Sequence, residues 1–149
     1  MFSPKKILVP TDFSAYSDKA LGRALDIAKQ HGAKIYLMHV VGLVHQCATD
    51  YCMDDAMVTQ LDKKSVESAK EMMKEQIKKA DNTDGVEIIS DVRKGTPYEE
   101  ILNEEKAKKV DLIVIASHGK TGLLAHLMGS VAEKVARGAK GSVLLVKGK

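Results

Sequence analysis

The 149-residue sequence contains no tryptophan, two phenylalanines, four tyrosines and two cysteines. With so few aromatic residues, a hydrophobic core must be built mainly from aliphatic side chains and methionine. The chain is about as long as one domain, which is enough for such a core without disulfides. Both cysteines, Cys47 and Cys52, lie in one polar segment and so do not form a disulfide framework. A low cysteine content without a disulfide framework is typical of proteins of the reducing cytoplasm, where we expect this protein to act.

Long apolar runs and a large excess of one charge are also absent. No stretch approaches the roughly 18 consecutive apolar residues that a membrane span requires. The first predicted strand begins at Lys6, so we expect no signal peptide before it. The formal net charge is only +3, and basic and acidic residues are interleaved along the chain. We therefore expect neither a membrane nor a nucleic acid as partner, and a single domain over residues 1–149.

The sequence does contain a regular alternation of short apolar runs and amphipathic segments. The apolar runs are predicted to be strands, at residues 6–9, 33–41, 86–92, 112–116 and 142–146. The segments with apolar residues at helical spacing are predicted to be helices, at residues 14–30, 56–80, 96–109 and 130–137. This alternation predicts right-handed β-α-β units, and therefore an α/β fold with a doubly wound, largely parallel sheet and helices on both faces.

Local signals predict how these elements end and how deeply they are buried. Gly32 is expected to end the first helix. Thr96 with Glu99, and Ser130 with Glu133, are expected to form capping boxes at two helix starts. The first, fourth and fifth apolar runs lack a polar face, as is typical of strands buried on both sides.

In open α/β sheets, ligands bind outside the carboxyl ends of the strands. Asp12 follows the first strand there, and the segment after the fourth contains three glycines, at positions 119, 122 and 129. Glycine allows close approach to a ligand and dihedral angles closed to other residues. The helix expected at Ser130 favours an anion at its N-terminus. His118 and Lys120 are further candidates for phosphate contact, and Asp12 is a candidate for a ribose hydroxyl or a metal shared with phosphate.

The glycine-rich segment has a second interpretation, in which the glycines form ordinary turns and Ser130 only caps its helix. Local chemistry does not choose between the two. A Walker A loop is excluded because Val114 stands where that loop needs glycine. A Rossmann dinucleotide site is not favoured, because no G-x-G-x-x-G follows the first strand.

The segment Ile113–Ser130, with the sequence IVIASHGKTGLLAHLMGS, resembles the nucleotide loop of the universal stress protein family. The ATP-binding members of that family carry Gly, two residues, Gly, nine residues, and then Gly followed by Ser or Thr. Nine residues separate Gly119 from Gly129 here, whereas Ala116 stands in place of the first glycine. Three further segments resemble the family's first, second and last strands: KILVPTDFS at 6–14, LMHV at 37–40 and SVLLVK at 142–147.

The resemblance implies a five-stranded parallel sheet in the order 3-2-1-4-5, as in adenine nucleotide α-hydrolase-like proteins. It also implies a site for ATP, with Mg²⁺ or Mn²⁺ held through the phosphates and not by a metal site of the protein. The residues implied to line adenine and ribose are Pro10, Thr11, Asp12, Val40, Ile115 and Ala116. The residues implied to hold the phosphates are Gly119, Gly129, Ser130 and Val131. Members of the family commonly pair through the last strand, which implies a homodimer through Ser142–Lys147.

The leading interpretation is a nucleotide-responsive stress or regulatory protein, in which ATP changes the shape of a dimer or its affinity for protein partners. Hydrolysis is expected to be slow or absent, because the loop offers no positioned base and no arginine-finger candidate. One alternative is a dimeric interaction module that no longer uses nucleotide, which Ala116 favours. The other, less favoured, is an enzyme of the wider adenylate-hydrolysing group.

Several other residues could be read as metal ligands or site residues, but a structural role is favoured for each of them. His45, Cys47 and Cys52 share a loop with several aspartates, but a solvated loop is favoured over a metal site, because no second cysteine pair exists. His39 lies in a predicted strand and is expected to pack with a backbone partner. Met72 is expected, like its neighbour Met73, to serve core or dimer packing.

Overall fold

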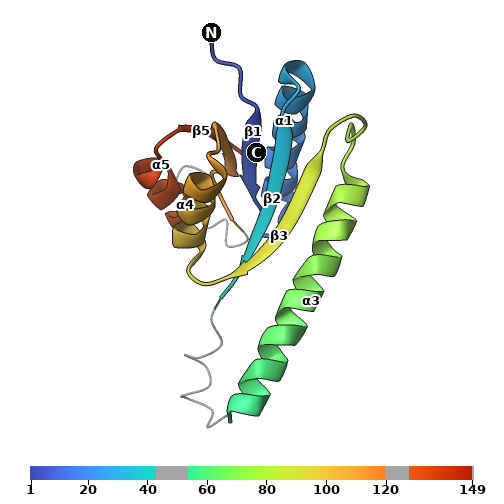
Figure 1. Ribbon diagram of the computed structural model, residues 1–149, viewed down its shortest axis with the longest axis vertical. Helices are drawn as coiled ribbons and strands as arrows, with labels where there is room; N and C mark the ends of the chain where they lie inside the picture. The colour runs from blue at the N-terminus through green and yellow to red at the C-terminus, as the bar shows by residue number, and fades with distance from the viewer. Residues whose placement is uncertain (43–53, 120–127, 149) are drawn as a thin grey trace.

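The computed structural model describes residues 1–42, 54–119 and 128–148, and in them strands and helices alternate along the chain (Figure 1). The strands are β1 (Lys6–Pro10), β2 (Lys34–Val41), β3 (Ile88–Lys94), β4 (Leu112–Ala116) and β5 (Ser142–Val146). The helices are α1 (Ala15–His31), α3 (Asp55–Lys79), α4 (Pro97–Lys108) and α5 (Ser130–Gly138). Each predicted strand and helix is present, with small shifts of its ends.

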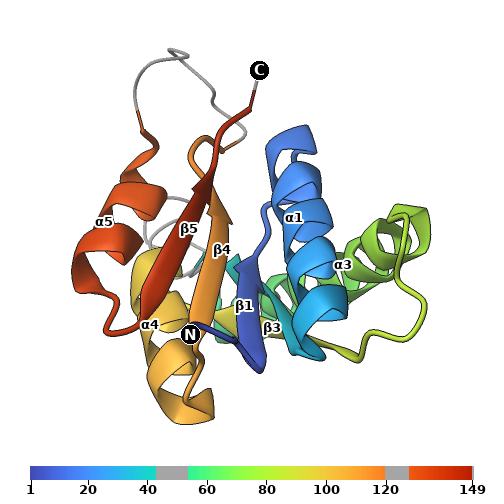
Figure 2. The same ribbon diagram turned by 90° about the horizontal axis from the view of Figure 1, so that it is seen from above.

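The five strands form one parallel sheet in the order β3-β2-β1-β4-β5, which confirms the predicted topology. β1 lies in the middle and pairs with β2 on one side and β4 on the other. Figure 2 shows α1 and α3 on one face of the sheet and α4 and α5 on the other. The chain therefore changes direction across the sheet between β1 and β4, the point at which open α/β sheets bind ligands.

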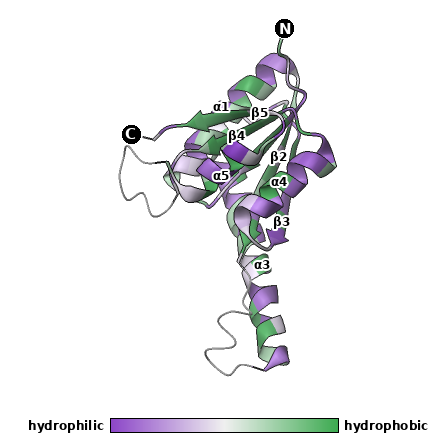
Figure 3. Ribbon diagram, turned by 90° about the vertical axis from the view of Figure 1, so that its left-hand side faces the viewer, coloured by the Kyte–Doolittle hydropathy of each residue, from purple (hydrophilic) through white to green (hydrophobic). Residues whose placement is uncertain are grey.

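Each face of the sheet has its own hydrophobic cluster. Ile7 of β1 packs with Leu21 of α1 on one face, while the next residue, Leu8, packs with Ile101 of α4 and Val135 of α5 on the other. Successive residues of a strand point to opposite faces, so β1 is buried from both sides. In the hydropathy colouring of Figure 3, β2, β4 and β5 are largely apolar, whereas α4 carries many polar residues.

β5 does not have the burial expected from its apolar sequence. It lies at an edge of the sheet and pairs with β4 alone, and its residues are partly or largely exposed. Leu144 is 38% exposed. The expectation that β5 is buried on both sides is therefore wrong, because its place in the strand order leaves one edge without a neighbouring strand.

The helix ends confirm one predicted signal and correct two. Gly32 ends α1 in the left-handed conformation, with φ of 62°. Thr96 precedes α4 as predicted, but its side chain makes no capping hydrogen bond. Ser130 is the first residue inside α5 and not its cap, because Gly129 occupies the cap position. Glu133 forms an ion pair with Arg137, with 2.9 Å between the two charged groups. Because neither helix start has a side-chain capping hydrogen bond, neither predicted capping box is formed.

β3 begins and ends two residues later than the apolar pattern predicts. Val86 donates its backbone N–H to the carbonyl of Thr83 and belongs to the preceding turn. At the other end, pairing with β2 continues through polar residues as far as Lys94, which lies opposite Val41. An edge strand tolerates such polar residues, so the hydrogen bonding of β3 continues beyond the end of its apolar sequence.

Across the three described stretches, none of the helices combines the length and the apolar character needed to cross a membrane.

The glycine inside α1 provides a stability test of this fold. A Cβ added to Gly22 would meet nothing within 4 Å. Gly22→Ala is therefore expected to raise the free energy of unfolding by about 0.5–1 kcal/mol, because alanine loses less backbone entropy on entering a helix. Urea denaturation measures the change. Gly32→Ala is the matched contrast: the same methyl group at φ of 62° should lower stability, and an equal response at both positions would contradict this explanation.

Candidate functional site

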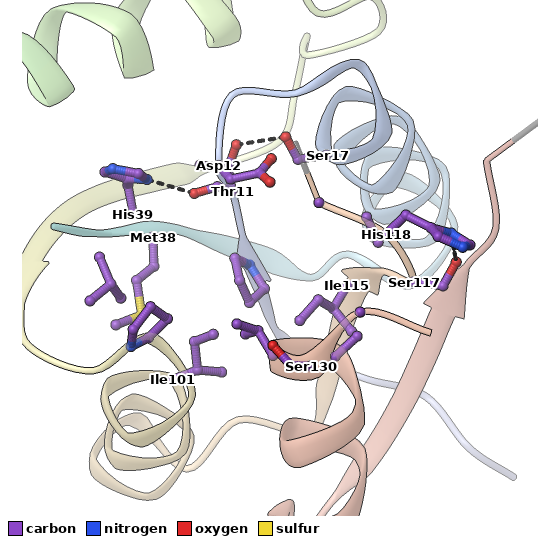
Figure 4. Close-up of a pocket in the computed structure, with 18 residues that line it drawn as sticks. Thr11, Asp12, Ser17, Met38, His39, Ile101, Ile115, Ser117, His118 and Ser130 are labelled. Carbon is purple, nitrogen blue, oxygen red and sulfur yellow. Dashed lines mark hydrogen bonds between the residues drawn. The ribbon is translucent and has the colours of Figure 1, made fainter. Parts of the chain in front are cut away.

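A cavity of about 220 Å³ lies at the carboxyl ends of β1, β2 and β4, next to the start of α5 (Figure 4). Every predicted site residue that the structure describes lines it. These residues are Pro10, Thr11, Asp12, Val40, Ile115, Ala116, His118, Gly119, Gly129, Ser130 and Val131. The remaining prediction, Lys120, lies outside the described residues. The fold thus brings together four segments that are far apart in the sequence.

Seven lining residues were not singled out by sequence reasoning: Ser17, Met38, His39, Pro97, Ile101, Ser117 and Ala132. Met38 and His39 are neighbours of Val40 in β2, so the predicted strand contained them without marking them as site residues. Pro97 and Ile101 come from the first turns of α4 and form part of the wall next to Met38. No local signal identifies them, because their contribution depends on α4 crossing to the face of the sheet that carries α5.

Thr11, the first residue after β1, is held by hydrogen bonds from several directions. Its N–H donates to the carbonyl of Met38 at 2.8 Å, and its own carbonyl accepts from Nδ1 of His39 at 2.7 Å. The Thr11 hydroxyl lies 2.9 Å from the side-chain oxygen of Gln76 in α3. The Thr11 hydroxyl is therefore engaged with α3, and His39 has the packed, backbone-bonded role that its strand position predicted.

Asp12 lies where the turn after β1 meets the segment after β4. Its Oδ1 accepts a hydrogen bond from the N–H of Ser14 at 3.0 Å. Its Oδ2 borders Gly119, because a Cβ added to that glycine would lie 2.9 Å from this oxygen. Asp12 is the one acidic side chain among the described residues of the cavity wall. The wall therefore carries a fixed carboxylate beside the glycine-rich segment.

The end of β4 and the start of α5 are joined by a short hydrogen bond. The N–H of Gly129 donates to the carbonyl of Ser117 at 2.6 Å, and the N–H of Ser117 donates to Val146 of β5 at 2.9 Å. The buried Ser117 hydroxyl lies 2.9 Å from Nδ1 of His118. These bonds fix the position of the α5 N-terminus against the sheet.

The two described glycines of this segment lie where room for a side chain is short, and neither has an unusual dihedral angle. Gly129 has φ of −62°, and a Cβ there would lie 3.3 Å from the Ser117 carbonyl oxygen. Gly119 has no positive φ either, and Asp12 is what limits the room at that position. The expectation that both adopt conformations closed to other residues is therefore wrong. Gly122, the third, lies outside the described residues.

Ala116 fits its position without backbone strain. It is the last residue of β4, opposite Val146 of β5. The residues other than glycine with positive φ in the described chain are Phe13, Asn82 and Lys109. Ala116 thus has an ordinary strand conformation, in which a methyl group costs little. The residue that departs from the family's pattern does not distort the wall of the cavity.

The cavity combines an apolar part with a part suited to an anion. Met38, Val40, Ile101 and Ile115 form apolar wall on one side, whereas Ser130 stands at the start of α5. The first turn of a helix leaves its N–H groups without partners inside the helix, and the helix dipole adds positive potential there. A flat apolar group with an anionic tail matches this arrangement.

Metal ligation has no comparable basis in the described stretches. No group of three or more His, Cys, Asp or Glu side chains comes together in them. The loop with His45, Cys47 and Cys52 lies outside the described residues, so both of its interpretations stay predictions. Met73 is buried in the core, as expected, whereas Met72 is 43% exposed on α3.

Comparisons with known proteins agree with the fold and the order of the segments. The model of the universal stress protein family matches residues 4–147. Universal stress protein MJ0531 of Methanocaldococcus jannaschii is 38% identical over 143 residues, covering 96% of this chain and 82% of the relative. Universal stress protein MJ0577 of the same organism is 32% identical over 157 residues, covering 97% and 96%.

Solved structures give the same result. The structure of MJ0577 matches with a TM-score of 0.85 at 32% identity and covers 99% of both chains. A universal stress protein solved in complex with cAMP has the same fold, with a TM-score of 0.69 at 24% identity over 98% of both chains. With the family model matched almost from end to end and with these relatives, the chain belongs to the universal stress protein family.

Proposed function

We propose that this universal stress protein binds an adenine nucleotide, with ATP as the expected ligand, in the cavity between β1, β2, β4 and α5. The observation that carries the proposal is the convergence of all described site residues on one cavity. Its apolar wall suits a purine base, and the α5 N-terminus beside Gly129 suits phosphate. The cAMP complex of a protein with this fold supports an adenine nucleotide as the class of ligand.

A divalent cation, Mg²⁺ or Mn²⁺, would be held mainly through the phosphates of the ligand. The structure supports no all-protein cation site in the described residues, and Asp12 is the one carboxylate among the described residues of the cavity wall. Mg²⁺ commonly binds through one carboxylate together with substrate phosphates. We expect hydrolysis to be slow or absent, because the loop sequence offers no positioned base and no arginine-finger candidate.

We further propose that the protein acts in the cytoplasm as a homodimer through β5, and that nucleotide changes its shape or its affinity for protein partners. The partly exposed β5, with Leu144 38% exposed at the sheet edge, supports this surface as the dimer contact. An open strand edge with apolar side chains is a ready template for pairing with another chain. The carboxyl end of β5 is hydrogen-bonded to Ser117 of the cavity wall, which connects the two sites.

Calorimetric titration of the nucleotide-stripped protein with Mg-ATP tests the proposed ligand. We expect dissociation constants in the micromolar range, about −8 kcal/mol of binding free energy, and weaker binding of Mg-GTP at the same site. A hundredfold excess over the dissociation constant should add about 2.7 kcal/mol of stability, visible as a higher melting temperature. Absence of both effects would remove nucleotide binding from the proposal and leave the dimeric interaction module as the better function.

A further inference from the structure

A buried hydrogen-bond chain connects α3 to the turn that follows β1. Gln76 of α3 is 7% exposed, and its Nε2 donates to Oδ1 of Asp18 in α1 at 2.8 Å. Because a carboxylate only accepts, this bond fixes which way the amide of Gln76 points. The amide oxygen therefore faces Thr11, whose hydroxyl lies 2.9 Å away and donates to it.

The same threonine hydroxyl holds the backbone of the turn. Its oxygen accepts a hydrogen bond from the N–H of Phe13 at 3.1 Å. Phe13 has φ of 65°, a left-handed conformation that a bulky residue adopts only when its surroundings impose it. The Phe13 ring packs against the ring of His39, with 4.4 Å between the centroids. The turn is thus held in a strained shape by Gln76 of α3, by Ser17 of α1, whose Oγ lies 3.0 Å from the Thr11 hydroxyl oxygen, and by His39 of β2.

Asp12 stands between the two restrained residues Thr11 and Phe13. It is the member of the turn that borders Gly119, because a Cβ added to that glycine would lie 2.9 Å from Oδ2 of Asp12. Figure 4 shows the Asp12 side chain among the residues that line the cavity. No residue of α3 is among the described residues that line the cavity. Among the described residues, Gln76 is the polar contact between α3 and the turn, so the influence of α3 that runs through the turn depends on Gln76.

We propose that Gln76 is a positioning residue for the nucleotide site: by holding Thr11 it fixes Asp12 at the cavity, so that α3 sets nucleotide affinity without touching the ligand. This inference rests on the proposed function and adds a means of regulating it. Coupling between two sites is reciprocal, so a partner that disturbs the α3 contact lowers nucleotide affinity, and bound nucleotide tightens the contact. The N-terminal part of α3 projects beyond the carboxyl ends of the strands, where a partner can reach it (Figures 1 and 3).

Gln76→Met tests the inference, because methionine keeps the volume and loses both hydrogen bonds. We expect the dissociation constant for Mg-ATP to rise about tenfold, which corresponds to about 1.4 kcal/mol. Met73→Ala is the matched control. Met73 is 2% exposed on the same helix and belongs to the hydrophobic cluster under α1. This control should lower the melting temperature at least as much as Gln76→Met and leave the dissociation constant unchanged.

A double-mutant cycle separates positioning through Thr11 from general loosening of the fold. Thr11→Val removes the hydroxyl, so Gln76→Met should weaken binding no further in that background. Additive losses, or an equal loss of affinity in Met73→Ala, would overturn the inference.

Hydrogen exchange of the ligand-free protein separates this inference from the proposed function. The Phe13 amide should lose protection in Gln76→Met and keep it in Met73→Ala. Unchanged protection would overturn the positioning role. Wild-type protein that binds no nucleotide would overturn the proposed function and the claimed effect on affinity, while the exchange result would still decide whether Gln76 holds the turn.

Discussion

Replacing Gly129 by aspartate is expected to weaken Mg-ATP binding by at least about a hundredfold, a loss of roughly 2.7 kcal/mol or more. The new Cβ would lie 3.3 Å from the Ser117 carbonyl oxygen and 3.8 Å from the nitrogen of Gly119. The added carboxylate would stand at the start of α5, where the phosphates are proposed to lie, so like charges would meet. Its side chain would also accept the helix N–H groups that phosphate is proposed to use.

This variant should lose binding without losing its fold. Gly129 has φ of −62° and occupies the cap position of α5, where aspartate is among the preferred residues. Calorimetric titration measures the binding, and thermal melting without ligand measures the fold. Gln60→Glu adds the same charge at an exposed position on α3 and is the control for net charge. Full affinity in Gly129→Asp would place the ligand elsewhere.

Glu105→Ala is expected to lower the free energy of unfolding by about 3 kcal/mol. Glu105 of α4 is 6% exposed, and Oε1 accepts hydrogen bonds from the backbone N–H groups of Lys140 at 3.1 Å and Gly141 at 2.8 Å. Hydrogen bonds to a charged group contribute about 1.5–3 kcal/mol each, and alanine would leave two backbone donors without their partner. This carboxylate therefore binds the backbone of the turn between α5 and β5.

Urea denaturation of three variants tests that assignment. Glu105→Gln keeps one acceptor oxygen and should lose less stability than Glu105→Ala. Glu75→Ala removes an exposed glutamate from α3 and should change stability by no more than about 0.5 kcal/mol. Equal losses in Glu105→Ala and Glu75→Ala would show that the turn is held by other contacts.

The parts of the fold that sequence predicted are those encoded locally. The spacing of apolar residues predicted the positions of the strands and helices. Gly32 predicted the end of α1, because few residues other than glycine adopt the left-handed conformation that ends a helix. The site was predictable because its residues follow strands directly. Because β1 and β4 are parallel neighbours, Asp12 and Gly119, which follow them, lie together at the carboxyl ends of the strands.

The features that sequence missed depend on contacts between distant elements. Gln76 and Glu105 read as ordinary polar residues of amphipathic helices, yet each has its partners on an element elsewhere in the chain. The apolar sequence of β5 does not say that it lies at an edge. Gly129 occupies the cap position of α5, with little room for a side chain beside Ser117, and Ser130 lies inside the helix instead of at the predicted cap.

The strand order has a consequence for the synthesis of the protein. β1 is made first, but its neighbour β4 starts at Leu112, and α5, which closes the cavity, starts at Ser130. A nascent chain can form β1, α1 and β2 from local contacts, whereas the β1–β4 pairing must wait for almost the whole sequence. We therefore expect the cavity to form only after the segments that contain β4 and α5 have been synthesised. A ligand held there would stabilise finished molecules and leave partly synthesised ones unprotected.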